Sequence, residues 1–222
     1  MRYLALASDY DGTLAKDGKV DLKTLEALSR LRDSGRKLIL VTGRRLENLL
    51  QVFPTIDLFD RLVLENGALL YYPATGEEKT LADRPSEKFI QTLREKGVDT
   101  LEIGRVIVAT WKPHETTVME VIRELGLELQ VILNKDAVMV LPSDLDKATG
   151  LLAVLEELGI SADRTVGVGD AENDLAFMKL CGFSVAVANA LPAIKESADW
   201  VTKSDRGAGV TELIDRIIAT DF

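Results

Sequence analysis

Residues 3–13 read YLALASDYDGT, an almost wholly apolar run that ends in two carboxylates and a glycine. An apolar run of this kind is typical of a strand that is buried on both faces of a parallel sheet. Side chains alternate along a strand, so Asp9 and Asp11 lie on the same side if the extended backbone continues. Gly12 then allows a sharp turn. Two anions held this close repel each other, which indicates a cation or an anion-processing task at the end of the strand.

The rest of the chain alternates apolar strands with amphipathic helices, which is the pattern of a mostly parallel α/β sheet. Further strands are predicted over residues 38–41, 61–64, 165–168, 184–188 and 200–202, with a hairpin over 69–72 and 77–81. The helices between them are predicted to begin after Asp21 and at about residues 45, 146, 191 and 210. We therefore predict an α/β fold with a Rossmann-like, mostly parallel sheet as its core.

Between residues 82 and 142 the pattern changes to helix, strand, helix, strand and strand. The expected elements are helices over 85–96 and 114–125 and strands over 105–111, 129–133 and 137–141. Helices on one face of a short antiparallel sheet would leave the other face free to cover something. We predict a core domain of residues 1–81 and 143–222, and a small inserted α/β cap domain of residues 82–142.

The bulk composition is that of an ordinary globular protein, with 46% hydrophobic and 28% charged residues among 222. A net charge of −9 argues against broad nucleic-acid binding, which needs a basic surface. A single cysteine, Cys181, and a single histidine exclude an intrachain disulfide and a Cys/His zinc site. No apolar run approaches the roughly 20 residues of a membrane span, and no signal peptide is recognisable. We predict a cytoplasmic protein without nucleic-acid or membrane partners.

Four polar segments follow predicted strands or begin a predicted helix. They are Asp9 with Asp11, Thr42 with Gly43, Lys147, and the run from Asp170 to Asp174. Ligands in open α/β sheets bind beyond the carboxyl ends of the strands, so all four segments are expected in one crevice. Several acids, a hydroxyl, a lysine and glycines in one place fit a phosphoryl-transfer site that binds Mg²⁺.

Each of these residue types has a task in such chemistry. Asp9 would attack phosphorus and form an aspartyl-phosphate, and Asp11 would protonate the leaving oxygen and then deprotonate a water. Lys147 would place a positive charge on the phosphoryl oxygens. Asp9, Asp170 and the main-chain carbonyl of Asp11 would bind Mg²⁺. Asp174 is the fourth candidate metal ligand, although we favour a role in which it holds Lys147 or a metal-bound water.

The candidate substrate- and phosphate-binding residues lie on the neighbouring segments. The Thr42 hydroxyl and the Gly43 amide would donate hydrogen bonds to phosphoryl oxygens. Arg44, Asn66 and Asn173 complete the set. Arg44 fits a surface position at the start of a helix equally well. Asn66 has a simple turn with Gly67 as its alternative interpretation.

Taken together, the motifs resemble the haloacid dehalogenase superfamily of phosphatases, specifically its Cof-type branch with an inserted α/β cap. The matching motifs are residues 9–13 (DYDGT), residues 41–44 (VTGR), Lys147 and residues 169–174 (GDAEND). The resemblance covers nearly the whole chain and includes residues 65–68 (ENGA). It implies an Asp nucleophile, an Asp acid/base, Mg²⁺, and a cap that closes over a small phosphorylated metabolite, such as 2-phosphoglycolate or a sugar phosphate.

Two other functions stay open for the same residues. A phosphotransferase or mutase would use the same aspartyl-phosphate with another acceptor in place of water. A signalling receiver domain also combines an acidic cluster, a Ser/Thr and a Lys, but it lacks an acid two positions after the nucleophile. The predicted function is therefore a Mg²⁺-dependent phosphomonoesterase, with phosphotransfer as the first alternative.

Overall fold

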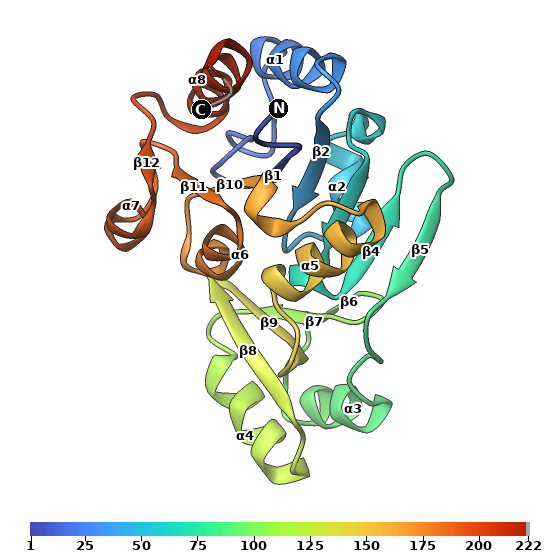
Figure 1. Cartoon of the computed structure of the whole chain (residues 1–222). Helices are drawn as coiled ribbons and strands as arrows, with labels where there is room; N and C mark the ends of the chain where they lie inside the picture. Colours follow the sequence, from blue (N-terminus) through green and yellow to red (C-terminus); the bar gives the residue numbers. More distant parts are fainter. Residues whose placement is uncertain (221–222) are drawn as a thin grey trace. The chain divides into compact units, whose positions relative to one another are not determined.

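A computed structural model describes residues 1–220, and the chain separates into two compact units (Figure 1). One unit contains Met1–Lys79 together with the residues from Asp146 onward, and the other is Thr80–Leu145. The division into a core domain of residues 1–81 and 143–222 and a cap domain of residues 82–142 stays a prediction.

The first unit contains an eight-stranded sheet in the order β12-β11-β10-β1-β2-β3-β4-β5, of which only the last residue of β5, Thr80, belongs to the second unit. Its strands are β1 (Ala5–Asp9), β2 (Lys37–Val41), β3 (Arg61–Leu64), β4 (Leu69–Tyr72), β5 (Glu77–Thr80), β10 (Thr165–Gly169), β11 (Phe183–Ala186) and β12 (Trp200–Val201). The strands from β12 to β3 pair in parallel, and β4 pairs antiparallel with β3. The predicted mostly parallel α/β sheet is confirmed.

The strand β1 lies between β2 and β10, and all five of its residues are buried. Asp9 lies opposite Val41 of β2, and Ser8 lies opposite Val168 of β10. The chain order reverses at β1, which is the place where open α/β sheets bind ligands. This register brings the loops that follow β1, β2 and β10 to one edge of the sheet.

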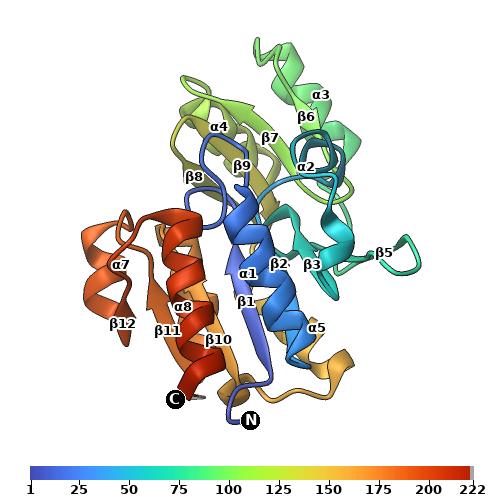
Figure 2. The same cartoon turned by 90° about the horizontal axis from the view of Figure 1, so that it is seen from above.

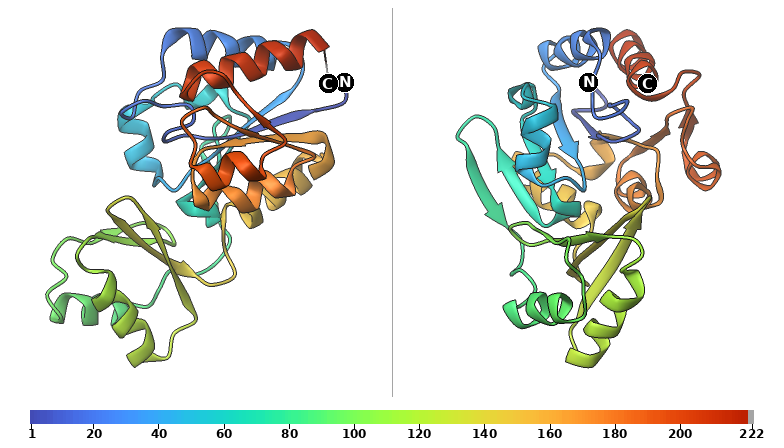
Figure 3. Two further views of the ribbon diagram at one scale, coloured as in Figure 1. Left: turned by 90° about the vertical axis from the view of Figure 1, so that its left-hand side faces the viewer. Right: turned by 180° about the vertical axis from the view of Figure 1, so that it is seen from behind.

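Helices cover both faces of the large sheet (Figure 3). α1 (Leu22–Asp33) and α8 (Arg206–Thr220) lie side by side on one face (Figure 2). α5 (Lys147–Leu158) and α6 (Leu175–Leu180) lie on the other face. The shorter helices α2 (Leu46–Val52) and α7 (Pro192–Ser197) complete this unit with four 3-10 turns, η1 (Ile56–Leu58), η2 (Glu65–Gly67), η3 (Ala162–Arg164) and η4 (Glu172–Asp174).

The last helix begins four residues before the position predicted from the sequence, at Arg206 in place of Val210. Gly207 and Gly209 weaken the helical pattern, because glycine is a poor helix former. The structure gives the reason for Gly207: a Cβ there would overlap Thr24 of α1. The glycine thus permits close packing between α1 and α8.

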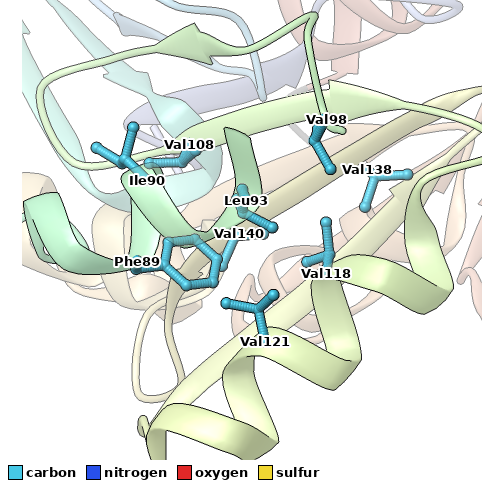
Figure 4. Close-up of a cluster of buried hydrophobic side chains, with 9 residues drawn as sticks. All are labelled: Phe89, Ile90, Leu93, Val98, Val108, Val118, Val121, Val138 and Val140. Carbon is cyan, nitrogen blue, oxygen red and sulfur yellow. The ribbon is translucent and has the colours of Figure 1, made fainter. Parts of the chain in front are cut away.

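The second unit is a four-stranded antiparallel sheet in the order β6-β7-β9-β8, with two helices. Its elements are α3 (Glu87–Glu95), β6 (Glu102–Ile103), β7 (Val108–Trp111), α4 (Glu115–Leu125), β8 (Leu129–Asn134) and β9 (Ala137–Pro142). Phe89, Leu93, Val118 and Val140 belong to a buried apolar cluster between the helices and the sheet (Figure 4). This unit therefore has a hydrophobic core of its own.

The strand predicted over 105–111 is wrong in its first half. The amide of Gly104 donates to Ile107 O at 2.8 Å, so residues 104–107 form a turn between β6 and β7. Val106 and Ile107 are buried within that turn, which explains why they resemble strand residues in the sequence. Across residues 1–220, every helix is too short or too polar to span a membrane.

Candidate active site

The candidate nucleophile Asp9 ends β1 and is almost fully buried, with 4% of its surface exposed. Its Oδ1 accepts a hydrogen bond from Lys147 Nζ at 2.7 Å. Its Oδ2 is buried and accepts no hydrogen bond from any residue in the range 1–220. A buried carboxylate oxygen without a partner is costly, so this atom is a natural contact point for a ligand.

Lys147 is the first residue of α5 and is also buried. Its Nζ donates to Asp9 and, at 2.6 Å, to Asp174 Oδ1. The start of α5 is fixed by a capping box between Asp146 and Thr149. A Cβ on Gly67 would overlap the carbonyl of Asp146, so the glycine in η2 allows α5 to approach. The capping box and the close contact with Gly67 thus fix the start of α5, and with it the position of Lys147.

Asp174 and Asp170 belong to the segment after β10. Asp174 Oδ2 accepts from the backbone amides of Asp170 at 2.9 Å and Ala171 at 3.0 Å. With Lys147 on Oδ1, both oxygens of Asp174 are already occupied. The Asp170 carboxylate accepts from the Thr13 hydroxyl at 3.2 Å. These contacts favour Asp174 as the residue that holds Lys147, and Asp170 as the more accessible acid.

The charges of this cluster are strongly coupled. Burial and then the negative charge of Asp174 raise the pKa of Asp9, although Lys147 opposes them. Burial alone would lower the pKa of Lys147, but the charges of Asp174 and Asp9 outweigh it and raise that pKa. Lys147 therefore stays positively charged among the acids.

The candidate phosphate-binding residues converge on the turn η2. Thr42 is buried, and its hydroxyl accepts from the amide of Arg44 at 3.2 Å. A Cβ on Gly43 would lie 3.0 Å from the side chain of Asn66. Asn173 Nδ2 donates to Asn66 Oδ1 at 3.2 Å. The predicted positions after β2, in η2 and in η4 are therefore neighbours in space.

Three consecutive residues of η2 have left-handed backbone, with φ of 52° for Glu65, 55° for Asn66 and 104° for Gly67. Left-handed backbone costs about 1–2 kcal/mol for a residue with a Cβ. Residues held in this way gather at functional sites, where the surrounding structure imposes the conformation. The turn carries Asn66 between Gly43 and Asn173.

Asp11 and Arg44 contact each other directly. Arg44 Nε donates to Asp11 Oδ2 at 2.6 Å, and Nη2 donates to Oδ1 at 2.7 Å. The sequence predicts each of them in the site but does not predict this pair. Within residues 1–220 the acids close enough to share one cation are Asp9, Asp170 and Asp174, without the Asp11 carboxylate.

Comparison with known proteins places this geometry in a family. The sequence model of the haloacid dehalogenase-like hydrolase family matches residues 6–109 and 130–214. The chain belongs to this family. The resemblance inferred from the four motifs is confirmed, and so is the prediction of an enzyme of the phosphatase kind.

Curated relatives match along almost the whole chain. Phosphoglycolate phosphatase from Methanothermobacter thermautotrophicus is 31% identical, over 96% of this chain and 98% of its own length. Phosphoglycolate phosphatase 2 from Saccharolobus solfataricus is 30% identical, over 99% of this chain and 94% of its own length.

Solved structures share the fold at low identity. A haloacid dehalogenase-like hydrolase from Bacteroides thetaiotaomicron aligns with a TM-score of 0.81 and 20% identity, covering 97% of this chain and 99% of that one. A sugar phosphatase of haloacid dehalogenase subclass IIB aligns with a TM-score of 0.77 and 19% identity, covering 96% and 98%. At these identities the likeness concerns the fold alone, and the predicted fold class agrees with it.

Sequence reasoning did not single out Asn189, which is hydrogen-bonded to the loop of the candidate nucleophile. Asn189 follows β11, and its Nδ2 donates to the carbonyl of Gly12 at 2.8 Å. Its Oδ1 accepts from the amide of Arg206, the first residue of α8, at 2.8 Å. A lone asparagine after a strand belongs to no sequence motif. Its link to the site is visible only in the hydrogen bonds to Gly12 and Arg206.

The acids at this edge fit a Mg²⁺ ion by the chemistry of their donors. Carboxylate oxygens of Asp9, Asp170 and Asp174 lie within 4.8 Å of one another, and hard oxygen ligands are the ones that Mg²⁺ prefers. The unpartnered Oδ2 of Asp9 is the observation that supports the fit most directly. A Cβ on Gly12 would overlap the carboxylate of Asp170, so the glycine keeps space for that acid beside the loop.

Proposed function

We propose that this phosphatase is a Mg²⁺-dependent phosphomonoesterase that hydrolyses a small phosphorylated metabolite through an aspartyl-phosphate on Asp9. The observation that carries the proposal is the carboxylate of Asp9. One of its oxygens is fixed by Lys147, and the other is buried without a partner. A fixed and desolvated carboxylate of this kind is suited to attack on phosphorus.

In the first step, a carboxylate oxygen of Asp9 forms a bond to phosphorus while the bond from phosphorus to the leaving oxygen breaks. Asp11, which must carry a proton when the substrate is bound, gives that proton to the leaving oxygen. In the second step, Asp11 takes a proton from water, the water oxygen attacks phosphorus, and the bond to Asp9 breaks with release of inorganic phosphate. Both residues return to their starting state.

The other residues counter charge on the phosphoryl group. Mg²⁺, when bound to Asp9, Asp170 and the carbonyl of Asp11, supplies positive charge that lets the anionic nucleophile approach the phosphate dianion. Asp174 orients Lys147, whose charge adds to this stabilisation. The hydroxyl of Thr42 and the amide of Gly43 donate to the phosphoryl oxygens.

For the substrate we propose 2-phosphoglycolate first and a sugar phosphate second. The first choice rests on the names of relatives at 30–31% identity, and the second on a fold neighbour at 19%. The predicted cap, residues 82–142, belongs to this proposal as the part that selects the leaving group.

The test is release of inorganic phosphate from both substrates and from p-nitrophenyl phosphate, with Mg²⁺ and with a chelator. We expect Asp9→Asn to retain less than a tenth of the wild-type rate, a barrier increase above about 1.4 kcal/mol. The control is Asp215→Asn on α8, which removes an exposed partner of Arg30 on α1. Turnover that survives the chelator, or an active Asp9→Asn variant, would contradict the mechanism. Phosphate found on an added alcohol in place of water would favour phosphotransfer.

A further inference from the structure

The side chain of Arg44 is bound to Asp11 in a way that uses its planar shape. Nε and Nη2 donate to the two oxygens of one carboxylate, at 2.6 and 2.7 Å. Two parallel hydrogen bonds fix the rotation of the carboxylate as well as its position. A lysine would hold the same charge without fixing the rotation.

The arginine is itself held firmly. Its guanidinium carbon lies 5.4 Å from the centre of the Tyr10 ring, at a distance typical of a cation–π contact. Tyr10 is fully buried, and its hydroxyl donates to Gly18 O at 2.9 Å. The backbone of Arg44 is fixed as well, since its amide donates to Thr42 Oγ1 and its carbonyl accepts from the amide of Glu65.

Asp11, by contrast, lies in the loop after β1, and a third of its side chain is exposed. Without a partner, an exposed aspartate on a loop samples several rotamers. A group that transfers a proton must lie within hydrogen-bond reach of the reacting oxygen. Something must therefore fix this carboxylate.

We propose that Arg44 is a positioning residue that orients the carboxylate of Asp11 for proton transfer, and that it is not a ligand of the substrate phosphate. This inference rests on the proposed function, in which Asp11 is the acid and base. Asp11 occupies the Nε–Nη2 edge of the guanidinium, one of the two edges through which an arginine can hold an oxyanion with two hydrogen bonds. A dianionic substrate bound at that edge would have to displace the Asp11 carboxylate.

The experiment is a double-mutant cycle with Arg44→Met and Asp11→Asn, assayed on 2-phosphoglycolate, whose alkoxide leaving group needs a proton, and on p-nitrophenyl phosphate, whose leaving group does not. We expect Arg44→Met to lower kcat on the alkyl ester at least tenfold, with a smaller loss on the aryl ester. KM should change less than twofold. In the Asp11→Asn background, Arg44→Met should have no further effect on kcat, because residues that act as one unit are not additive.

Two further variants keep the result interpretable. Arg44→Lys retains the charge and should rescue less than a third of the lost kcat if the bidentate geometry matters. Arg30→Met breaks an arginine–aspartate pair on the surface, at 2.7 Å from Asp215, and should leave both kcat and KM unchanged. Thermal unfolding of each variant separates loss of fold from loss of positioning, and Arg44→Lys serves as the test if Arg44→Met does not fold.

Several outcomes would overturn the inference. A rise in KM of the same size in both backgrounds would identify Arg44 as a phosphate ligand. Full activity of Arg44→Met, or losses that multiply in the double variant, would show that it does not act through Asp11. If Asp11→Asn alone is as fast as wild type, the proton-transfer role of Asp11 fails, and the positioning role fails with it. Loss of activity in Asp9→Asn is independent of all these results, so the nucleophile is tested separately.

Discussion

The side-chain amide of Asn189 joins the loop after β11 to the loop of the proposed nucleophile, through a hydrogen bond of 2.8 Å to Gly12 O. The two residues are 177 positions apart in the chain. Because the side-chain oxygen of Asn189 accepts from the first amide of α8, one asparagine links the beginning of the sheet to the last helix.

We expect Asn189→Asp to weaken both this link and the activity. The substitution replaces the amide donor by a carboxylate oxygen that faces the Gly12 carbonyl, and the loss of one hydrogen bond at this partly buried place costs about 0.5–1.5 kcal/mol. Urea unfolding should show a loss in that range, with a fall in kcat. Asn134→Asp, at the end of β8 in the other unit, is the control. Equal stability of both variants would mean that the link is unimportant.

Replacement of Lys147 by Met should destabilise the protein strongly. The change leaves the buried Asp9 and Asp174 without their cation, and breaking a buried ion pair by removing one partner costs about 3–5 kcal/mol. Lys79→Met is the matched control, because Lys79 pairs with Glu157 at the surface. We expect a much smaller change there.

The same variant should show a definite pH dependence. Burial and the charge of Asp174 already raise the pKa of Asp9 above its unfolded value of 3.8. Loss of Lys147 raises it further. The folded state then binds the proton more tightly than the unfolded state, so stability falls as pH rises above about 4. Unfolding free energies that increase from pH 4 to pH 8 would contradict this assignment.

Gly67→Ala should disturb the start of α5 and hence Lys147. The residue has φ of 104°, and a Cβ there would overlap Asp146 O. Left-handed backbone costs about 1–2 kcal/mol and overpacking about 1–3 kcal/mol. Gly126→Ala is the control, since that glycine has φ of 61° and no atom within 4 Å of its would-be Cβ. Urea unfolding should show a larger loss for Gly67→Ala, and equal losses would exclude the overlap as a cause.

Cys181 should be inert towards thiol reagents in the folded protein. Burial raises its pKa to about 12, and the thiolate is the reactive form. At pH 8 we expect an aromatic disulfide reagent to react only as fast as the chain unfolds, and at once in urea. Rapid reaction of one thiol per native chain would contradict the burial of this residue.

The sequence was sufficient for those parts of the site that combine a buried strand with a polar end. Asp9 ends β1, while Thr42 and Asp170 follow β2 and β10, and the register of parallel strands brings such positions together. The pair of Asp11 with Arg44 could not be predicted, because it depends on the direction of two side chains. Asn189 was missed for a related reason: its partners are backbone groups, which carry no sequence signal.

The fold shows the same distinction. Apolar runs and helical spacing predicted the large sheet and its order of elements. The turn at 104–107 was missed because Val106 and Ile107 are buried in it, and burial is what the strand pattern detects. The early start of α8 was missed because Gly207 disfavours a helix in its own sequence. It is needed there for close packing against Thr24 of α1.

The place of β1 between β2 and β10 has a consequence for biosynthesis. β2 leaves the ribosome soon after β1, but β10 follows only after residues 80–145 have been translated. For that period the nascent strand with Asp9 has one edge without a neighbour, and an unpaired edge promotes association with other chains. Translation of the inserted unit is therefore a stage at which this edge of the sheet is open to association with other chains.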